Sequence, residues 1–254
     1  MARPRLMTDP VLLLRAAALV GILALWQVIF WSGLLYRGVV PSLWAIGDAL
    51  VGLLLSAQFY ENLAVTGYEV AGALLIGGGI GLLAGIGLGA SRFASRGFEP
   101  YVHYLAPTPK IVFLPVLLVA FGTGPQSKLA LGAVSAFFPM ALTIAAGVRG
   151  IDPVLLRVGR SLRLRRMQML RLIYLPALLR PLATGLKLAF GLAMVGALLA
   201  EISLSNAGLG YIAAQDYGHF QTAEMYAVLI MVFALAAIGN AAIGRLVRAG
   251  GPLG

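Results

Sequence analysis

The sequence is poor in the residues that carry most catalytic and metal chemistry. Its 254 residues include no cysteine, two histidines and nine acidic residues. The lack of cysteine excludes a disulfide framework and a thiolate metal site. The histidines, His103 and His219, are isolated and have no metal-ligand spacing. No carboxylate pair, histidine cluster or activated nucleophile stands at a workable spacing, so the sequence gives no support for an enzyme.

Charged residues are also scarce, at 11%, whereas 60% of the residues are hydrophobic and the mean hydropathy is +0.93. Soluble domains contain roughly 25% charged and 45–50% apolar residues. This composition predicts an all-α integral membrane protein, which we expect to form one domain over residues 1–254. Apolar runs long enough to cross a bilayer lie at 11–31, 70–89, 101–121, 129–148, 182–202 and 226–246, and a long basic loop occupies 149–181.

The basic residues are distributed unevenly between the predicted loops. If the N-terminus is cytoplasmic, most of the 19 basic residues fall inside, Arg37 and Lys128 fall outside, and Lys110 and Lys187 lie within spans. The positive-inside rule therefore places both termini in the cytoplasm. The net charge of +10 thus follows membrane topology and does not indicate a nucleic-acid partner. The first run ends in the bulky stretch LWQVIFW, so we expect a retained anchor and not a cleaved signal peptide.

The stretch RVGRSLRLRRMQMLRLIYLP, residues 157–176, concentrates arginines in the basic loop. Topology alone could explain the charge, but the pattern is also amphipathic. Arg166 falls inside the apolar stripe, which predicts two short helices with a break around residues 163–166, ended by Leu175–Pro176. Such a hairpin is typical of a docking surface. Its apolar stripe comprises Leu155, Val158, Leu162, Met169 and Ile173, and its basic side comprises Arg157, Arg160, Arg163 and Arg171.

This loop resembles the cytoplasmic loop of permease subunits of ATP-binding-cassette (ABC) importers of the nitrate, sulfonate, taurine and bicarbonate kind. The family pattern reads approximately E-A-A-x-x-x-G, a nine-residue gap, then I-x-L-P. Ile173, Leu175 and Pro176 match its second half, but Arg157 replaces the acidic residue and Arg163 the glycine. Further segments resemble the family in the same order: VPSLWAIGDAL, LAPTPKIVFLPVLLVAFGTG, TGLKLAFGLAMVGALLAEI and AGLGYIAA.

The resemblance implies a type I importer fold in the bacterial cytoplasmic (inner) membrane, with two permeases side by side. We expect a homodimer, and a heterodimer stays open. Each permease would insert its coupling helices into an ABC ATPase subunit, and an extracytoplasmic binding protein would deliver the substrate. ATP and Mg would bind to the ATPase, since this chain has no G-x-x-x-x-G-K-[ST] phosphate loop and needs no cofactor of its own. The implied coupling residues are Arg157, Gly159, Arg160, Ser161, Leu162, Arg163, Ile173, Leu175 and Pro176.

The two arginine replacements leave three interpretations open. The cognate ATPase could have an unusually acidic groove. Alternatively, this chain could be a degenerate subunit that pairs with a standard permease. The third interpretation belongs to a different functional class: the protein could be an ATP-independent transporter or channel whose basic loop binds anionic lipid.

Several residues inside the predicted spans carry further hypotheses. Gly77, Gly81, Gly85 and Gly89 recur every four residues and form a smooth strip for close helix packing, within the protomer or between protomers. Ionisable residues in spans are functional candidates by default. Lys110 stands among prolines that interrupt a helix, so Lys110, Pro107 and Pro109 are predicted to line the path if the substrate is an anion. Alternatively, the span starts nearer Lys110, and residues 99–109 form an elbow at the membrane interface.

Glu69 and Glu201 lie near the outer ends of their predicted spans. They could line the external mouth of the path, or they could reach interfacial water. We therefore include Glu201 among the candidate path residues. The external loop at residues 203–222 could contact the binding protein or close over the path.

Overall fold

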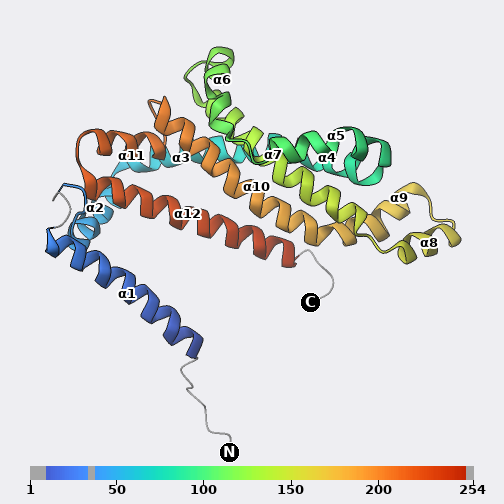
Figure 1. The fold of residues 1–254 in the computed structure, drawn as a ribbon, viewed down its shortest axis with the longest axis horizontal. Coiled ribbons are helices and arrows are strands. Elements are labelled where there is room, and N and C mark those ends of the chain that lie inside the picture. The colour runs from blue at the N-terminus through green and yellow to red at the C-terminus, as the bar shows by residue number, and fades with distance from the viewer. Residues whose placement is uncertain (1–9, 34–37, 250–254) are drawn as a thin grey trace, which may run out of the picture. The chain divides into compact units, whose positions relative to one another are not determined.

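The computed structural model describes residues 10–33 and 38–249, and these contain helices but no strand. Figure 1 shows the helices in chain order. They are α1 (Pro10–Ser32), α2 (Leu43–Leu55), α3 (Ala57–Ala73), the π-helix η1 (Leu74–Gly78), α4 (Gly79–Ala90), α5 (Arg92–Leu105), the 3-10 helix η2 (Lys110–Phe113), α6 (Leu114–Phe121), α7 (Pro125–Arg149), α8 (Pro153–Ser161), α9 (Arg166–Met169), the π-helix η3 (Leu170–Tyr174), α10 (Leu175–Ser203), α11 (Leu209–Gly218) and α12 (Thr222–Ala249).

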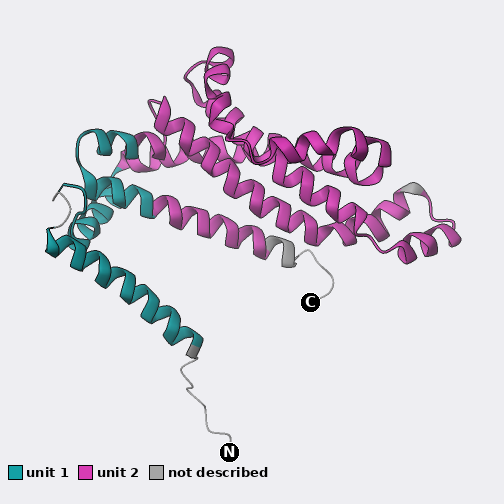
Figure 2. Ribbon diagram, in the orientation of Figure 1, with its two compact units in different colours: residues 1–56, 213–230 teal, residues 57–212, 231–254 magenta. Residues whose placement is uncertain are grey.

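The chain forms two compact units, coloured separately in Figure 2. Unit 1 comprises residues 1–56 and 213–230, and unit 2 comprises residues 57–212 and 231–254. Within unit 1, the Trp26 indole N–H donates to the carbonyl oxygen of Pro41 (3.1 Å), and its ring meets Tyr226 edge-on with centroids 5.1 Å apart. This anchors α1 to the segment before α2 and to the start of α12.

Helix α7 is the centre of unit 2, where it packs against α10, α4 and α3. The glycines of α4 determine how closely α4 approaches it. A Cβ atom at Gly81 would lie 2.6 Å from the carbonyl oxygen of Phe137, and one at Gly85 would lie 2.6 Å from that of Ala141. Gly77 and Gly89 face α7 in the same way. The glycine strip therefore lies against a helix of the same chain.

The predicted span at 101–121 is not one straight helix. Helix α5 and the η2–α6 segment meet at an angle of 95°. Pro107 and Pro109 lie in this bend, where neither can donate a backbone hydrogen bond. Five helical segments are long and apolar enough to cross a membrane, namely Val11–Ser32, Ala57–Ala90, Pro125–Arg149, Met167–Ser203 and Thr222–Arg245, and the bent pair would make a sixth.

The basic loop contains α8 and α9, which are separated by the turn at residues 162–165. This confirms the break that was predicted because Arg166 would fall in the apolar stripe of a continuous helix. The expectation that Leu175–Pro176 ends the hairpin is wrong. The chain runs through η3 into α10, and residues 167–203 are helical without interruption. The wider π turn explains this: the Leu175 N–H bonds back to the carbonyl of Leu170, and Pro176 falls in the first turn of α10, where its missing N–H is tolerated.

Candidate functional site

The first candidate site is the segment from α8 to η3, called the coupling segment below (residues 153–174). Helix α8 is capped by Asp152, whose carboxylate accepts a hydrogen bond from the backbone N–H of Val154 at 2.7 Å, and it begins at Pro153. Helix α8 packs closely against α9 and η3 because Gly159 is buried against Met169 and Ile173. A side chain at Gly159 would displace the ends of the Met169 and Ile173 side chains.

The outer side of α8 is amphipathic and uncovered. Val154, Leu155, Val158 and Leu162 are each at least 48% exposed. Arg157, Arg160 and Arg163 are also exposed, and none of the ion pairs found among the described residues involves them. Apolar contact area and unpaired cations are thus available together on one short helix, which suits binding to an apolar groove with an acidic rim.

The turn after α8 has a backbone that explains the family's glycine. Arg163 has φ +52°, in the left-handed region where glycine is favoured. The turn is stabilised by a bond from the Leu164 N–H to the carbonyl of Gly159 (3.0 Å) and by the Gln168 side chain, which accepts from the Arg165 N–H (2.8 Å). An arginine therefore occupies a position whose geometry suits glycine.

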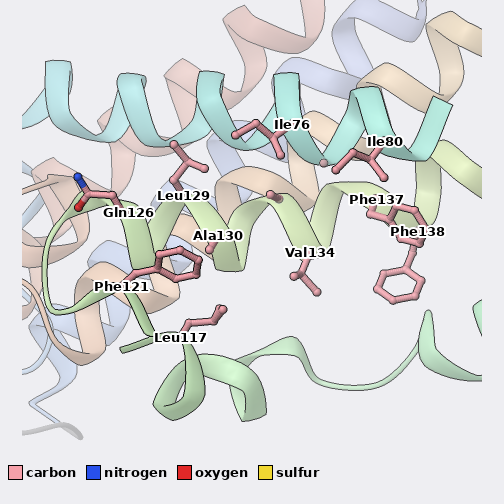
Figure 3. Close-up of a pocket in the computed structure, with 12 residues that line it drawn as sticks. Ile76, Ile80, Leu117, Phe121, Gln126, Leu129, Ala130, Val134, Phe137 and Phe138 are labelled. Atoms are coloured by element: carbon pink, nitrogen blue, oxygen red, sulfur yellow. The ribbon is translucent and has the colours of Figure 1, made fainter. Parts of the chain in front are cut away.

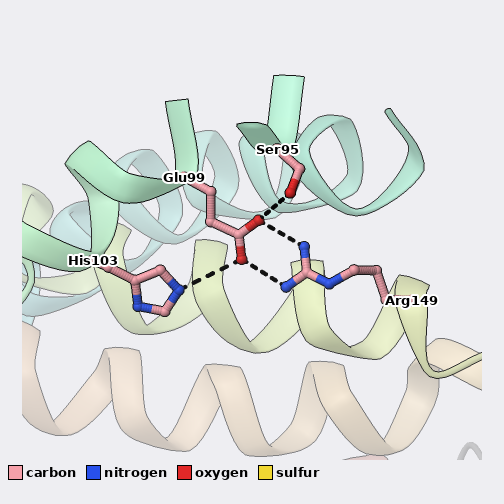
Figure 4. A network of polar contacts seen from close by, with 4 residues as sticks. All are labelled: Ser95, Glu99, His103 and Arg149. Carbon is pink, nitrogen blue, oxygen red and sulfur yellow. Dashed lines mark hydrogen bonds and ion pairs between the residues drawn. The ribbon is translucent and has the colours of Figure 1, made fainter. Parts of the chain in front are cut away.

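Sequence reasoning missed an ion pair that links α5 to the end of α7, shortly before the coupling segment. Figure 4 shows Glu99 of α5 between Arg149, Ser95 and His103. The Arg149 guanidinium donates two hydrogen bonds to the Glu99 carboxylate, at 2.7 and 2.8 Å, and Ser95 donates a third at 2.6 Å. Bidentate pairs of this kind fix orientation as well as distance. Since Arg149 ends α7, α5 is linked to the point where the coupling segment begins.

The second candidate site surrounds the bend at Lys110. Pro107, Pro109 and Lys110 line a partly open pocket of about 280 Å³, whose other walls are formed by residues of α7 and α10, Ser135 among them. The Lys110 ammonium donates to the carbonyls of Leu105 (3.1 Å), Ala106 and Thr108 (2.7 Å). It also lies 4.7 Å from the centre of the Phe138 ring. Lys110 therefore holds the bend closed while it brings a positive charge to the pocket.

A larger pocket, shown in Figure 3, has a different character. It has a volume of about 610 Å³ and lies between η1 and α4 on one side and α6 and α7 on the other. Its lining is apolar, with Ile76, Ile80, Phe121 and Phe137 among its residues, and Gln126 is the exception. With no charged group in its lining, this pocket does not suit an anion.

Glu69 and Glu201 are 1% exposed. The expectation that they reach interfacial water is therefore wrong, and Glu201 lies outside the Lys110 pocket. Lys128, expected in an external loop, is also only 1% exposed. The available sequence signal was the spacing of Asn62, Thr66 and Glu69, which places three polar residues on one face of α3.

Comparison with known proteins identifies the family. The family of the binding-protein-dependent transport system inner membrane component matches residues 77–249, a range that includes the coupling segment and the Lys110 bend. The chain belongs to this family. It is accordingly a membrane permease subunit of an ABC transporter and not an enzyme.

The sequences of named permeases align with this chain over most of its length. The putative aliphatic sulfonates transport permease protein SsuC of Bacillus subtilis is 32% identical over 210 residues, covering 83% of this chain and 76% of the relative. The taurine transport system permease protein TauC of Escherichia coli is 29% identical over 183 residues, covering 72% and 66%. The nitrate import permease protein NrtB of Synechococcus elongatus is 24% identical, covering 89% and 86%.

Among solved structures, the MetNI methionine ABC transporter in an inward-facing conformation matches with a TM-score of 0.64 and 24% identity. The match covers 80% of this chain and 98% of that chain. The fold expected from the sequence, an all-helical type I importer permease, is therefore confirmed.

Proposed function

We propose that this chain forms the translocation pathway of an ATP-driven importer for a small anion of the sulfonate, taurine, nitrate or bicarbonate class. The observation that carries the proposal is the coupling segment, where exposed apolar side chains and exposed arginines lie together on α8 and the turn that follows it. The named relatives transport aliphatic sulfonates, taurine, nitrate and bicarbonate. All four substrates contain an oxyanion group.

In this proposal the coupling segment docks in a groove of a separate ABC ATPase, which holds ATP and Mg. Closure of the ATPases moves α8, and the Glu99–Arg149 pair transmits that movement to α5. A second permease, another copy of this chain or a related one, completes the pathway, and an extracytoplasmic binding protein delivers the anion. Both termini would face the cytoplasm, because that orientation puts the coupling segment on the same side as the ATPase.

The Lys110 pocket is the candidate for contact with the anion. Its positive charge is not neutralised by a carboxylate in either ion pair found in the described part of the chain. The three carbonyls that Lys110 binds stabilise the ammonium without cancelling its charge. A small oxyanion could therefore be attracted to this bend without being trapped there.

The test is ATPase activity in lipid nanodiscs that contain this chain with the ATPase and binding protein of the same transporter. We expect Arg157→Glu to lower stimulation by the binding protein at least tenfold and to weaken assembly with the ATPase, because it reverses a charge on the docking face. Arg92→Glu, an exposed arginine outside the coupling segment, serves as the control. Unchanged assembly and unchanged salt sensitivity in Arg157→Glu would contradict docking through this face.

Transport tests the pathway separately. Lys110→Met should reduce anion uptake while ATPase assembly stays normal, since it removes the charge without altering the coupling segment. Uptake at unchanged affinity would remove Lys110 from the pathway. If assembly requires a second, different permease, the heterodimer replaces the homodimer; if no ATPase binds under any pairing, the importer proposal fails.

A further inference from the structure

A buried polar cluster joins α3, α10 and the segment before α11, well away from the coupling segment. It consists of Asn62, Thr66 and Glu69 of α3, Lys128 of α7 and Glu201 of α10, and each of the five is at most 7% exposed. Burying ionisable groups in a membrane-spanning bundle is costly unless charge and hydrogen bonds are satisfied. The residues of the cluster must therefore neutralise one another's charges and satisfy their hydrogen bonds within the protein.

Three consecutive backbone N–H groups at the start of α11 are bound by side chains of this cluster. Asn62 accepts from Gly208 (2.6 Å), Thr66 from Leu209 (2.9 Å) and Glu201 from Gly210 (2.6 Å). The Thr66 hydroxyl in turn donates to the second Glu201 oxygen at 2.6 Å. Glu201 thus acts as a remote N-cap for α11, a position at which a negative charge is stabilised.

Glu201 is consequently the carboxylate whose ionised form is best supported. Both of its oxygens accept hydrogen bonds, and the Lys128 ammonium lies close enough to attract it. Lys128 itself donates to the carbonyls of Thr123 and Gly124, which hold it at the start of α7. One ionised carboxylate and one ammonium already make the cluster electrically neutral.

Glu69 is the exception in this arrangement. Within the described part of the chain, its two carboxyl oxygens are the buried side-chain atoms that have no hydrogen-bond donor. The ionisable groups that act on Glu69 are the Glu201 carboxyl and Lys128. An ionised Glu69 would be a second buried negative charge, without donors, beside another carboxylate. Two carboxyls sharing a site in this way are stable when they hold one proton between them.

We propose that Glu69 and Glu201 form a proton-binding site, in which a proton carried by Glu69 is donated to Glu201 and ties α3 to α10. The proton satisfies the unpartnered Glu69 and leaves the cluster with one negative and one positive charge. It also keeps the Glu201 carboxylate in position to hold Gly210. The bound proton is thus a structural ligand of the turn between α10 and α11, and its loss would place two negative charges in the cluster and release that turn.

The experiment is infrared spectroscopy of the purified full chain in nanodiscs at pH 7, which detects the carbonyl stretch of a protonated carboxylic acid directly. We expect this band in the wild type, shifted by 13C-glutamate labelling and by exchange into D2O. Glu69→Gln should abolish the band and leave the thermal unfolding temperature within a few degrees of wild type, because the amide copies the shape and donor of a protonated Glu69. Glu61→Gln, at an exposed position on the same helix, should retain the band.

Glu201→Gln supplies the contrast, because it replaces an ionised acceptor of two hydrogen bonds by a group that has only one acceptor oxygen. It should lower the unfolding temperature far more than Glu69→Gln. Absence of the band in the labelled wild type would overturn the proposal without any variant having to fold. A band that survives Glu69→Gln would also overturn the proposal. If the wild type lacks the band and its stability rises with sodium concentration, the ligand of this site is sodium and not a proton.

Discussion

The coupling segment before α10 and the polar cluster near the end of α10 both concentrate charged side chains, but they use them differently. Arg157, Arg160 and Arg163 of the coupling segment are exposed and belong to none of the ion pairs in the described residues, so their charge is available to another molecule. The side chains of the cluster are buried; Asn62, Thr66 and Glu201 bind one another or the start of α11, and Lys128 binds backbone carbonyls at the start of α7. The comparison teaches that exposure, and not charge, separates the two roles: substitutions in the cluster should affect folding, whereas those in the coupling segment should affect assembly.

The largest effect is expected at Gly208, where the turn lies directly on the Glu201 carboxylate. Gly208 has φ +107°, and a Cβ atom there would overlap that carboxylate. Gly208→Ala combines backbone strain with displacement of a buried charge, so we expect a loss of about 3–5 kcal/mol of stability. Thermal unfolding in detergent measures it. Gly218→Ala, where a Cβ would meet nothing within 4 Å, is the control, and an equal loss in both variants would contradict the special role of the cluster.

A second test asks whether close packing alone, without charge, has a comparable effect in the same unit. Gly85→Ala would force α4 away from the carbonyl of Ala141 and from Ile144, and we expect a loss of about 1–3 kcal/mol, as for other overpacked cores. Gly87→Ala, on the open side of the same helix, should cause no loss. The comparison is again made by thermal unfolding. Equal behaviour of the two variants would show that the glycine strip does not set the helix distance.

At the coupling segment the expected change in stability is smaller and of opposite sign. Arg163→Gly should stabilise the isolated chain by about 1 kcal/mol, because glycine adopts the left-handed conformation that Arg163 occupies at a cost. Arg157→Gly, in the middle of α8, should instead destabilise it by a similar amount. A destabilising Arg163→Gly would mean that the arginine side chain makes contacts that outweigh the backbone strain.

Sequence reasoning succeeded where one element carries the whole signal. The amphipathic pattern of residues 155–173 predicts two helices, and the four-residue glycine period predicts a packing face, because both depend on residues one turn apart. It missed the buried cluster of Glu69, Glu201 and Lys128, because these residues come from three helices and meet only in the fold. It also failed at Pro176, since a proline gives no sign that a preceding π turn will accommodate it.

The smallest change in stability is expected at Asp216 of unit 1. Its carboxyl is half-buried, so it is less exposed than the arginines of the coupling segment and less buried than the polar cluster. Burial, and next the Glu224 carboxylate, raise the pKa of Asp216 above its ordinary value, while His219 partly opposes them. Because the folded chain binds this proton more readily than the unfolded chain, ionised Asp216 lowers stability at neutral pH, and the cost disappears as the pH falls to the range where aspartate is protonated.

Asp216→Asn should therefore raise the unfolding temperature slightly at pH 7, and the gain should shrink as the pH approaches about 4, near the ordinary pKa of aspartate. Asp48→Asn, at an exposed position in the same unit, provides the matched control. A gain that persisted unchanged at low pH would mean that Asp216 acts through packing and not through its charge. If the gain follows the pH, partial burial together with the nearby Glu224 carboxylate makes ionised Asp216 costly, and the more deeply buried Glu69–Glu201 pair is the stronger form of the same effect.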